Sequence, residues 1–164
     1  STPLVVVFAV EELRLSYGDW TWANGLAFPI AQLLVIPIAG RLSDAAGVVR
    51  TTAISFVVLG VFFASLPFVA TAGGLIAAHA LYGVAMAGVD VGWALGPLRF
   101  APQGRARVYM SVHFSLVGIR SILAPLLGYG IKSLFSLETA FACSAGLMAA
   151  ACATALAARR ARLG

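Results

Sequence analysis

The chain has 164 residues, of which 61% are hydrophobic and only 10% are charged, and its formal net charge is +5. Its mean hydropathy is +0.97. A water-soluble domain of this length cannot hide so much apolar surface, since roughly a third of the surface that the unfolded chain exposes stays wet. Composition therefore excludes an ordinary soluble domain and indicates an integral membrane protein. Apart from Arg120, the arginines fall at the ends of apolar runs and do not cluster with aromatic residues, so no nucleic acid is expected as a partner.

Five apolar runs follow one another, each near the ~20 residues that a helix needs to cross ~30 Å of hydrocarbon. They cover residues 21–39, 51–70, 73–98, 107–131 and 137–158. Residues 3–10 are apolar but too short to span, and we expect them to be the end of a longer helix that is cut at Ser1. No run alternates apolar and polar residues as the strands of a membrane barrel would. The sequence predicts an all-α integral membrane protein with about five transmembrane helices and an N-terminal helix stub.

The basic residues predict the orientation of these helices, because cytoplasmic loops carry an excess of Lys and Arg. Eight arginines occupy alternate joints and the C-terminus: Arg41, Arg50, Arg99, Arg105, Arg107, Arg159, Arg160 and Arg162. The opposite side carries only Arg14 and Lys132, beside four acidic residues. We therefore expect a multi-pass protein of the cell membrane, embedded in the lipid bilayer, with the arginine-rich side and the C-terminus in the cytoplasm.

The stretch GRLSDAAGVVR forms a polar joint between the first two runs. Gly40 and Gly47 are expected to permit the backbone angles and the close approach of a tight turn. Asp44 is expected to lie just before the next helix, where free N–H groups and the helix dipole favour a carboxylate. A capped turn that carries the positive-inside charges of Arg41 and Arg50 is one interpretation of this joint.

A second interpretation comes from the order of the residues in the joint. Gly40, Leu42, Asp44 and Gly47 form the pattern Gly-x-Leu-x-Asp-x-x-Gly, which resembles the signature loop of the Major Facilitator Superfamily. In that family the loop joins the second and third helices of each six-helix half, and its aspartate helps to latch the cytoplasmic gate. The stretch APLLGYG, residues 124–130, is similar to the Pro/Gly-rich stretch on the matching fifth helix.

The resemblance extends in order over nearly the whole chain. It implies the C-terminal half of a twelve-helix bundle, with most of the first helix of that half missing and the N-terminal half as partner. It also implies that the partner surface of Asp44 lies on that other half. The usual basic residues after the aspartate and after the second glycine are replaced by Ala45 and by Val48 and Val49, and such weak signature loops are more typical of the second half.

A polar and aromatic face runs along residues 73–98. At 100° per residue, six side chains fall within about 80° of one another: His79, Tyr82, Met86, Asp90, Trp93 and Pro97. On another side, glycines at a spacing of four let a neighbouring helix approach closely: Gly88, Gly92 and Gly96. A charge at depth costs about 2.5–3.5 kcal/mol on insertion scales, so we expect Asp90 to face water, a substrate or a partner. An interfacial residue or a structural ion pair is the alternative.

Arg120 lies near the middle of its span, too deep for its side chain to reach water easily. His113 shares its face, two turns earlier. The rise of 1.5 Å per residue puts Asp90 about 12 Å, His113 about 9 Å and Arg120 about 20 Å from the arginine-rich side. An Asp–His pair suits proton transfer near neutral pH, and an Asp–Arg pair can break and reform as a cavity opens; a packed, neutral histidine is the alternative for His113. Asn24 and Gln32 are expected to add uncharged hydrogen bonds to the same cavity.

These residues predict a secondary active transporter of a small molecule, coupled to protons, and not an enzyme. The sequence has no nucleophile elbow or paired-acid motif, and no Gly-x-x-x-x-Gly-Lys-Ser/Thr loop for a nucleotide. Cys143 and Cys152 face opposite sides of one helix and are expected only to fill space. His79 and His113 lie at different depths, which excludes a shared haem, and no cofactor or metal is expected. A non-transporting scaffold or receptor-like protein of the same fold is the alternative.

Overall fold

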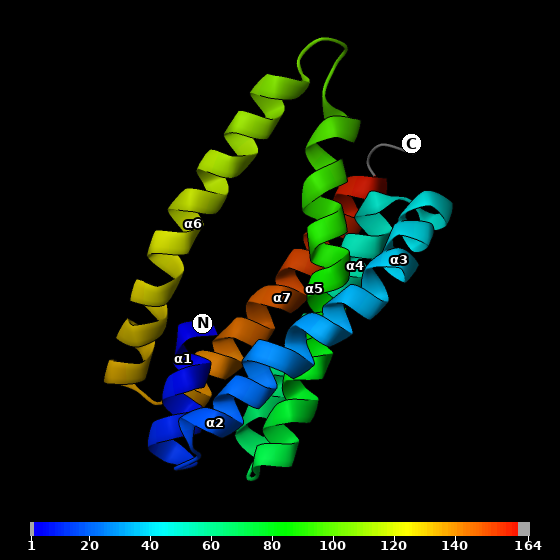
Figure 1. Cartoon of the computed structure of the whole chain (residues 1–164). Coiled ribbons are helices and arrows are strands. Elements are labelled where there is room, and N and C mark those ends of the chain that lie inside the picture. Colours follow the sequence, from blue (N-terminus) through cyan, green and yellow to red (C-terminus); the bar gives the residue numbers. More distant parts are fainter. Residues whose placement is uncertain (1, 161–164) are drawn as a thin grey trace.

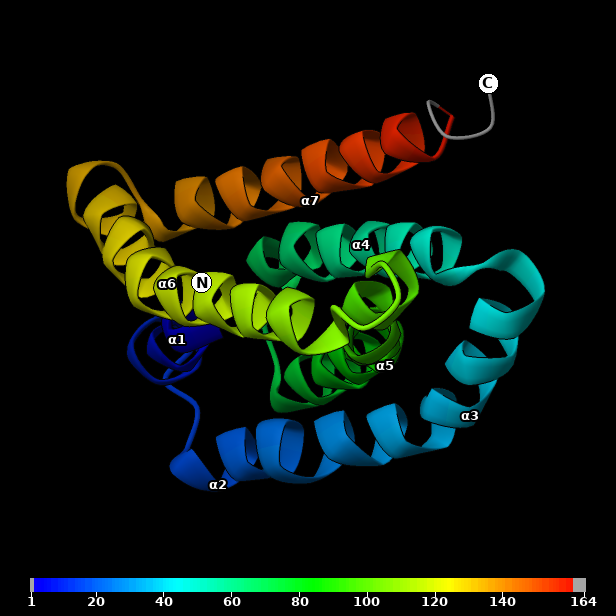
Figure 2. The same cartoon turned by 90° about the horizontal axis from the view of Figure 1, so that it is seen from above.

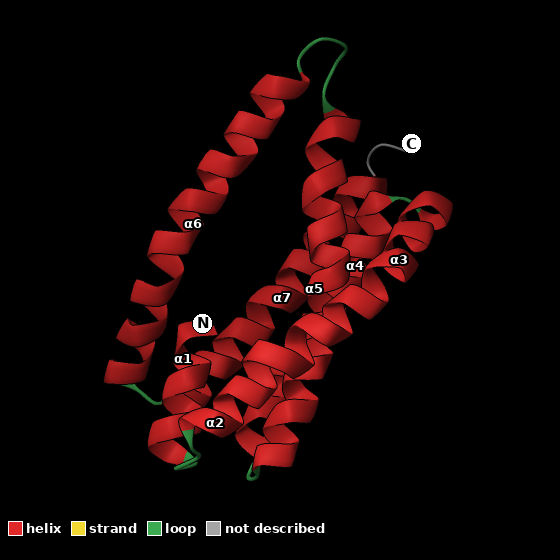
Figure 3. Cartoon of the chain, in the orientation of Figure 1, coloured by secondary structure: helices red, strands yellow, loops and turns green. Residues whose placement is uncertain are grey.

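The structure, a computed structural model, describes the backbone of residues 2–160 and the side chains of residues 3–157. Within these ranges all regular structure is helical, and no strand is formed (Figure 3). Five helices are long and apolar enough to cross a membrane, which confirms an all-α, multi-pass membrane protein at the level of length and composition. Four residues named above lie outside the described side chains: Ser1, Arg159, Arg160 and Arg162.

The helices follow the predicted spans in order. Two short segments come first, α1 (Thr2–Val7) and the π-helical η1 (Phe8–Glu12). The first crossing is a continuous rod made of α2 (Tyr17–Trp20), the π-helical η2 (Thr21–Ala27) and α3 (Phe28–Ala46). The other four are α4 (Val48–Ser65) with the 3-10 turn η3 (Leu66–Phe68), α5 (Ala72–Phe100), α6 (Ala106–Leu134) and α7 (Leu137–Arg160). Each crossing extends past its predicted range at one end or both, because its polar terminal turns are also helical.

The π-helical segment η2 of the first crossing has a cause in the sequence. Pro29 has no N–H to give to the carbonyl four residues earlier, which removes one α-helical hydrogen bond. Just before it, the amide of Phe28 donates to the carbonyl of Ala23, five residues back, which is the hydrogen bond of a π-helix. Pro37 removes a second bond inside α3, and the rod bends along its length (Figure 2). The two prolines thus account for the irregular hydrogen bonding and the bend of this crossing.

Small residues pack α5 against α4. Figure 2 shows α5 lying between α3 and α4, which are its principal neighbours. A Cβ on Gly88 would overlap the hydroxyl of Ser55, and one on Gly92 would overlap the hydroxyl of Thr52. Gly96 has more room, with the nearest atom, on Val48, 4.0 Å from such a Cβ. The predicted close approach along this glycine stripe is confirmed at its first two positions, where the helices leave no space for a side chain.

On its other side, α5 meets the backbone of α3. A Cβ on Gly83 would overlap the carbonyl oxygen of Phe28 and would lie 3.0 Å from both the Ala31 Cβ and the Gln32 backbone nitrogen. A backbone atom cannot rotate away as a side chain can. The contact between α3 and α5 at this level therefore depends on the missing side chain of Gly83.

In contrast to these helices, α6 stands away from the bundle along much of its length (Figure 1). A loop joins it to α5 at one end, which we call the basic end because the joints there carry Arg41, Arg50, Arg99, Arg105 and Arg107. At its other end, Gly128 of α6 contacts Leu4. Lys132 Nζ also lies 3.1 Å from the Glu11 carboxylate, which ties α6 to η1. Most of the buried core, which includes Phe62 and Phe141, belongs to the segments that meet at this second end.

Candidate functional site

Asp90 faces α3 and is half-buried. Its carboxylate accepts a hydrogen bond from Gln32, whose Nε2 lies 2.5 Å from Oδ2. The backbone of Gln32 packs on Gly83, two helical turns before Asp90, so the glutamine side chain extends along α5 to reach the carboxylate. Gln32 therefore gives Asp90 an uncharged hydrogen bond, and its expected place in a shared cavity stays a prediction. Asn24 lies two turns earlier, in η2, and is half-buried.

Trp93 connects α5 to α6 through two contacts. The guanidinium carbon of Arg120 lies 4.7 Å from the centre of the indole ring, in cation–π geometry. The ring of His113 meets the same indole edge-on, with the centroids 6.1 Å apart. Three residues that were predicted from separate patterns on two helices, Trp93, His113 and Arg120, are thus brought together.

No ion pair forms between Asp90 and Arg120 in this structure. The two ion pairs in the described part of the chain join Arg99 to Asp44 and Lys132 to Glu11. Asp90 points to α3, whereas Arg120 rests on Trp93, one turn further along α5. The sequence placed the two charges within reach by depth alone, and depth carries no information about which side of α5 each one meets. Their exchange as a switching pair stays a prediction.

Asp90 and Arg120 both lie in membrane-spanning helices, and their neighbours compensate their charges poorly. A cation–π contact contributes about 0.5–2 kcal/mol, whereas an arginine at the centre of a transmembrane helix costs about 2.5–3.5 kcal/mol on insertion scales. The amide of Gln32 is a neutral donor to Asp90. Residues of this kind mark substrate or ion paths in membrane proteins far more often than they serve packing.

The first part of the predicted polar face of α5 is packed instead of open. Tyr82 stacks on Phe28 and on Phe62, with ring centroids 4.8 and 4.9 Å apart. His79 is buried, its Nδ1 lies 2.9 Å from the Leu75 carbonyl oxygen, and the ring of Trp20 contacts it in a T-shaped arrangement. Aromatic residues fill this part of the face because the core of the bundle lies at this end.

Met86 is half-buried between this aromatic group and Asp90. Along this face, polar contacts to other helices begin at Asp90. The predicted stripe is therefore divided into an aromatic, packed part and a part with polar or cationic partners, Gln32 on α3 and Arg120 on α6. Helical spacing predicts the shared face but not the neighbours that cover it.

A cavity of about 500 Å³ lies between α4, α5, α6 and α7 near the basic end. Its walls are almost entirely apolar and come from twelve residues: Val48, Val49, Thr52, Gly92, Gly96, Pro97, Phe100, Tyr109, Val112, His113, Leu116 and Ala155. His113 is its one titratable imidazole, and Nε2 of this ring is buried without a hydrogen-bond partner. Sequence reasoning missed this cavity, and the signal that could have found it is the lack of bulk at Gly96 beside Pro97.

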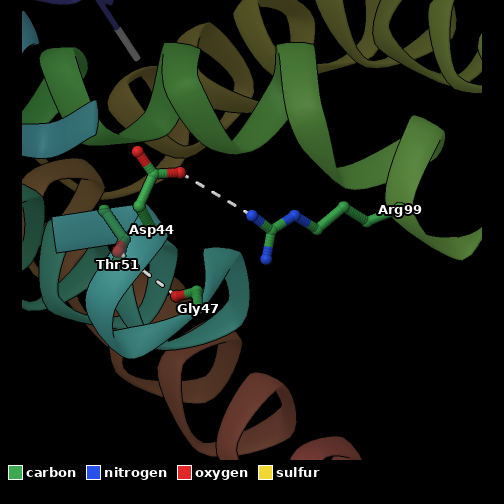
Figure 4. A network of polar contacts seen from close by, with 4 residues as sticks. All are labelled: Asp44, Gly47, Thr51 and Arg99. Carbon is green, nitrogen blue, oxygen red and sulfur yellow. Dashed lines mark hydrogen bonds and ion pairs between the residues drawn. The ribbon is translucent and has the colours of Figure 1, made fainter. Parts of the chain in front are cut away.

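The joint between α3 and α4 differs from its expected form (Figure 4). Gly47 has φ +87°, a conformation that L side chains rarely adopt, so this glycine is required. Gly40 is helical, and a Cβ placed there would meet nothing within 4 Å, so the expected role of Gly40 in the turn is wrong. Thr51 donates a hydrogen bond through Oγ1 to the carbonyl of Gly47 at 3.3 Å, which stabilises the first turn of α4.

Asp44 does not precede a helix. It belongs to the last turn of α3, and Gly47 occupies the N-cap position of α4, so the expected capping role of Asp44 is wrong. Its carboxylate lies 3.7 Å from the guanidinium of Arg99, at the end of α5. Figure 4 shows the two side chains pointing toward each other. The family resemblance implied that Asp44 contacts the other half of the transporter. In this structure its cationic partner, Arg99, belongs to the same chain. Arg41 and Arg50, on either side of the joint, are exposed.

No three His, Cys, Asp or Glu side chains of the described residues gather around one point, so none is assigned to a metal. Cys143 is exposed and Cys152 is half-buried. The chain matches no protein-family model, no curated protein and no solved structure. Its functional interpretation therefore depends on the uncompensated charges, the cavity and the joint at the basic end.

Proposed function

We propose that the chain is the C-terminal half of a twelve-helix transporter of the Major Facilitator type, which moves a small solute across the cell membrane by alternating access. One observation carries this proposal: Asp90 and Arg120 lie within neighbouring membrane helices, and neither has a counter-charge among the described residues. Such residues are expensive in lipid and are retained where they contact a solute, an ion or a second domain.

The joint between α3 and α4 supports the same proposal. Asp44 and Arg99 form an ion pair between two helix ends at the basic end, where a gate that opens to the cytoplasm would need a contact that can break. Both side chains are largely exposed, so the pair is weak and can exchange partners at little cost. In this proposal the basic end and the C-terminus are cytoplasmic, in accord with the excess of arginine.

Coupling to protons is part of the proposal and centres on Asp90. A fixed cation beside a carboxylate would hold it ionised, whereas an amide donor such as that of Gln32 imposes no full charge. A carboxyl group in this setting can take up and release a proton as the cavity alternates between the two sides of the membrane. His113, on the neighbouring helix, is the second candidate for the proton path.

Transport measurements on the protein that contains both halves test the proposal. Proteoliposomes loaded with a pH-sensitive dye are given panels of small organic anions, cations and neutral solutes, and proton movement is followed. We expect movement that depends on one class of solute and is lost or severely slowed in Asp90→Asn and in Arg120→Gln. Glu138→Gln, an exposed position on α7, is the matched control. Wild-type rates in both variants would show that the charges are structural, and a protein that inserts but moves neither solute nor protons would be a scaffold or receptor-like protein.

A further inference from the structure

The guanidinium of Arg120 is held on one face and free along its edge. The Trp93 ring covers the face at 4.7 Å. Within residues 3–157 no acidic side chain pairs with Arg120, and the guanidinium donates no hydrogen bond to the protein. An arginine carries five N–H donors in a planar fork that matches a carboxylate. A group with this orientation is arranged to receive an anion from outside the described residues.

A second unsatisfied group adjoins the same tryptophan. The ring of His113 contacts Trp93, and its Nε2 is buried without a partner. His113 also lines the apolar cavity of about 500 Å³, which has the size of a site for a small organic molecule. An imidazole nitrogen can donate to or accept from such a molecule at the inner wall of the cavity.

From these two observations we infer that the site binds an organic anion with an apolar body. The body occupies the cavity, near Tyr109, Val112 and Leu116. The carboxylate lies beside Trp93, where it meets the free edge of Arg120 and the nitrogen of His113. Apolar walls contribute most of the binding free energy and the charged pair contributes selectivity, because a cation at the same place would face Arg120. This inference names the substrate class of the proposed transporter and so rests on that proposal.

Direct binding tests the inference without requiring transport. The full protein is placed in nanodiscs of phosphatidylcholine, and three probes of one shape are compared: 2-naphthoate, 2-naphthalenemethanol and 2-naphthylmethylammonium. We expect saturable binding of 2-naphthoate that is at least about tenfold tighter than binding of the ammonium probe. Arg120→Gln should weaken binding of 2-naphthoate by about tenfold or more, and Arg120→Lys should retain part of it, because a lysine keeps the charge but not the fork.

A control variant on the same helix separates a specific effect from a general loss of positive charge. Arg107→Gln removes an exposed cation of α6 outside the cavity and should leave binding unchanged. Equal affinity for the anion and the ammonium probe, or an unchanged affinity in Arg120→Gln, would overturn the inference. So would loss of 2-naphthoate binding when phosphatidylglycerol is added to the nanodiscs, since the anion site would then belong to a lipid headgroup.

The outcomes also separate this inference from the proposed function. Anion binding that needs Arg120, in a protein that transports nothing, would contradict transport and leave the binding site established. Proton-coupled transport of a cation, with no binding of 2-naphthoate, would contradict the substrate class and leave transport standing.

Discussion

The carboxamide of Gln32 donates a hydrogen bond to the carboxylate of Asp90 across the contact between α3 and α5, with Nε2 2.5 Å from Oδ2. The two residues are 58 positions apart in the chain. They meet because Gly83 lets the backbone of α3 lie directly on α5, two turns before Asp90. A candidate proton-binding group is therefore positioned by helix packing, and changes in that packing should alter both stability and activity.

Replacing Gln32 by methionine keeps the length of the side chain and removes the donor. A hydrogen bond to a charged group contributes more than a neutral one, but Asp90 is only half-buried. We therefore expect Gln32→Met to lower the free energy of unfolding by about 1 kcal/mol, measured by titration with SDS in mixed micelles. Gln103→Met, in the exposed loop between α5 and α6, should have no measurable effect. Equal stabilities of the two variants would mean that the bond contributes nothing.

The tight contact at Gly83 makes a second prediction about stability. Gly83→Ala places a Cβ against the carbonyl of Phe28, and the helices must separate, at a cost of about 1–3 kcal/mol as for other overpacked sites. Gly96→Ala, on the same helix, meets no atom closer than 4.0 Å and should be neutral. The same SDS titration measures both variants. If Gly83→Ala were as stable as the wild type, the helices could not be packed as described.

The ion pair between Asp44 and Arg99 predicts a loss of activity without a loss of stability. The pair is exposed, and such pairs contribute about 0–1 kcal/mol, so Asp44→Asn and Arg99→Gln should unfold as the wild type does. We expect each to slow transport severalfold in proteoliposomes. The exchanged variant Asp44→Arg with Arg99→Asp should recover part of the rate if the two side chains act on each other. Full transport by Asp44→Asn would show that the joint has only a structural role.

The distribution of arginines predicts which ends of the helices face the cytoplasm. Reporter fusions after Gly47, Gln103 and Gly164 should be active on the cytoplasmic side, because the basic joints stay inside. Fusions after Ala72 and Ser136 should report the external side. A single fusion on the opposite side would be incompatible with five crossings in this orientation.

The order and number of the crossings were predictable because hydropathy depends only on composition along the chain. The glycine stripe at Gly88 and Gly92 was predictable for a similar reason, since a spacing of four fixes one face of a helix. These features depend on one helix at a time. Gly47 was also recognisable, because a tight reversal between two helices requires a residue that tolerates a positive φ.

Features that depend on two helices were harder to predict. Asp90 and Arg120 were placed at compatible depths, but in the structure Asp90 faces Gln32, whereas Arg120 contacts Trp93. Asp44 was expected to cap α4, and the last turn of α3 instead continues past it to Ala46. The cavity beside His113 had little signal in its own residues beyond Gly96 and Pro97, because apolar residues that line a space and apolar residues that fill one look alike in a sequence.

The separation of α6 from the other helices gives the bundle an uneven stiffness. Backbone contact at Gly83 and the filled spaces at Gly88 and Gly92 pack α3, α4 and α5 closely together, and we expect these three helices to move as a rigid body. By contrast, α6 is tied at its far end by Lys132 and Glu11 and touches α5 in its middle through side chains. Spin labels within the rigid body should keep their spacing when solute binds, whereas a label on α6 should move relative to it. Because Arg120 travels with α6 and Asp90 with the rigid body, the distance between these two charges would then vary as the protein moves.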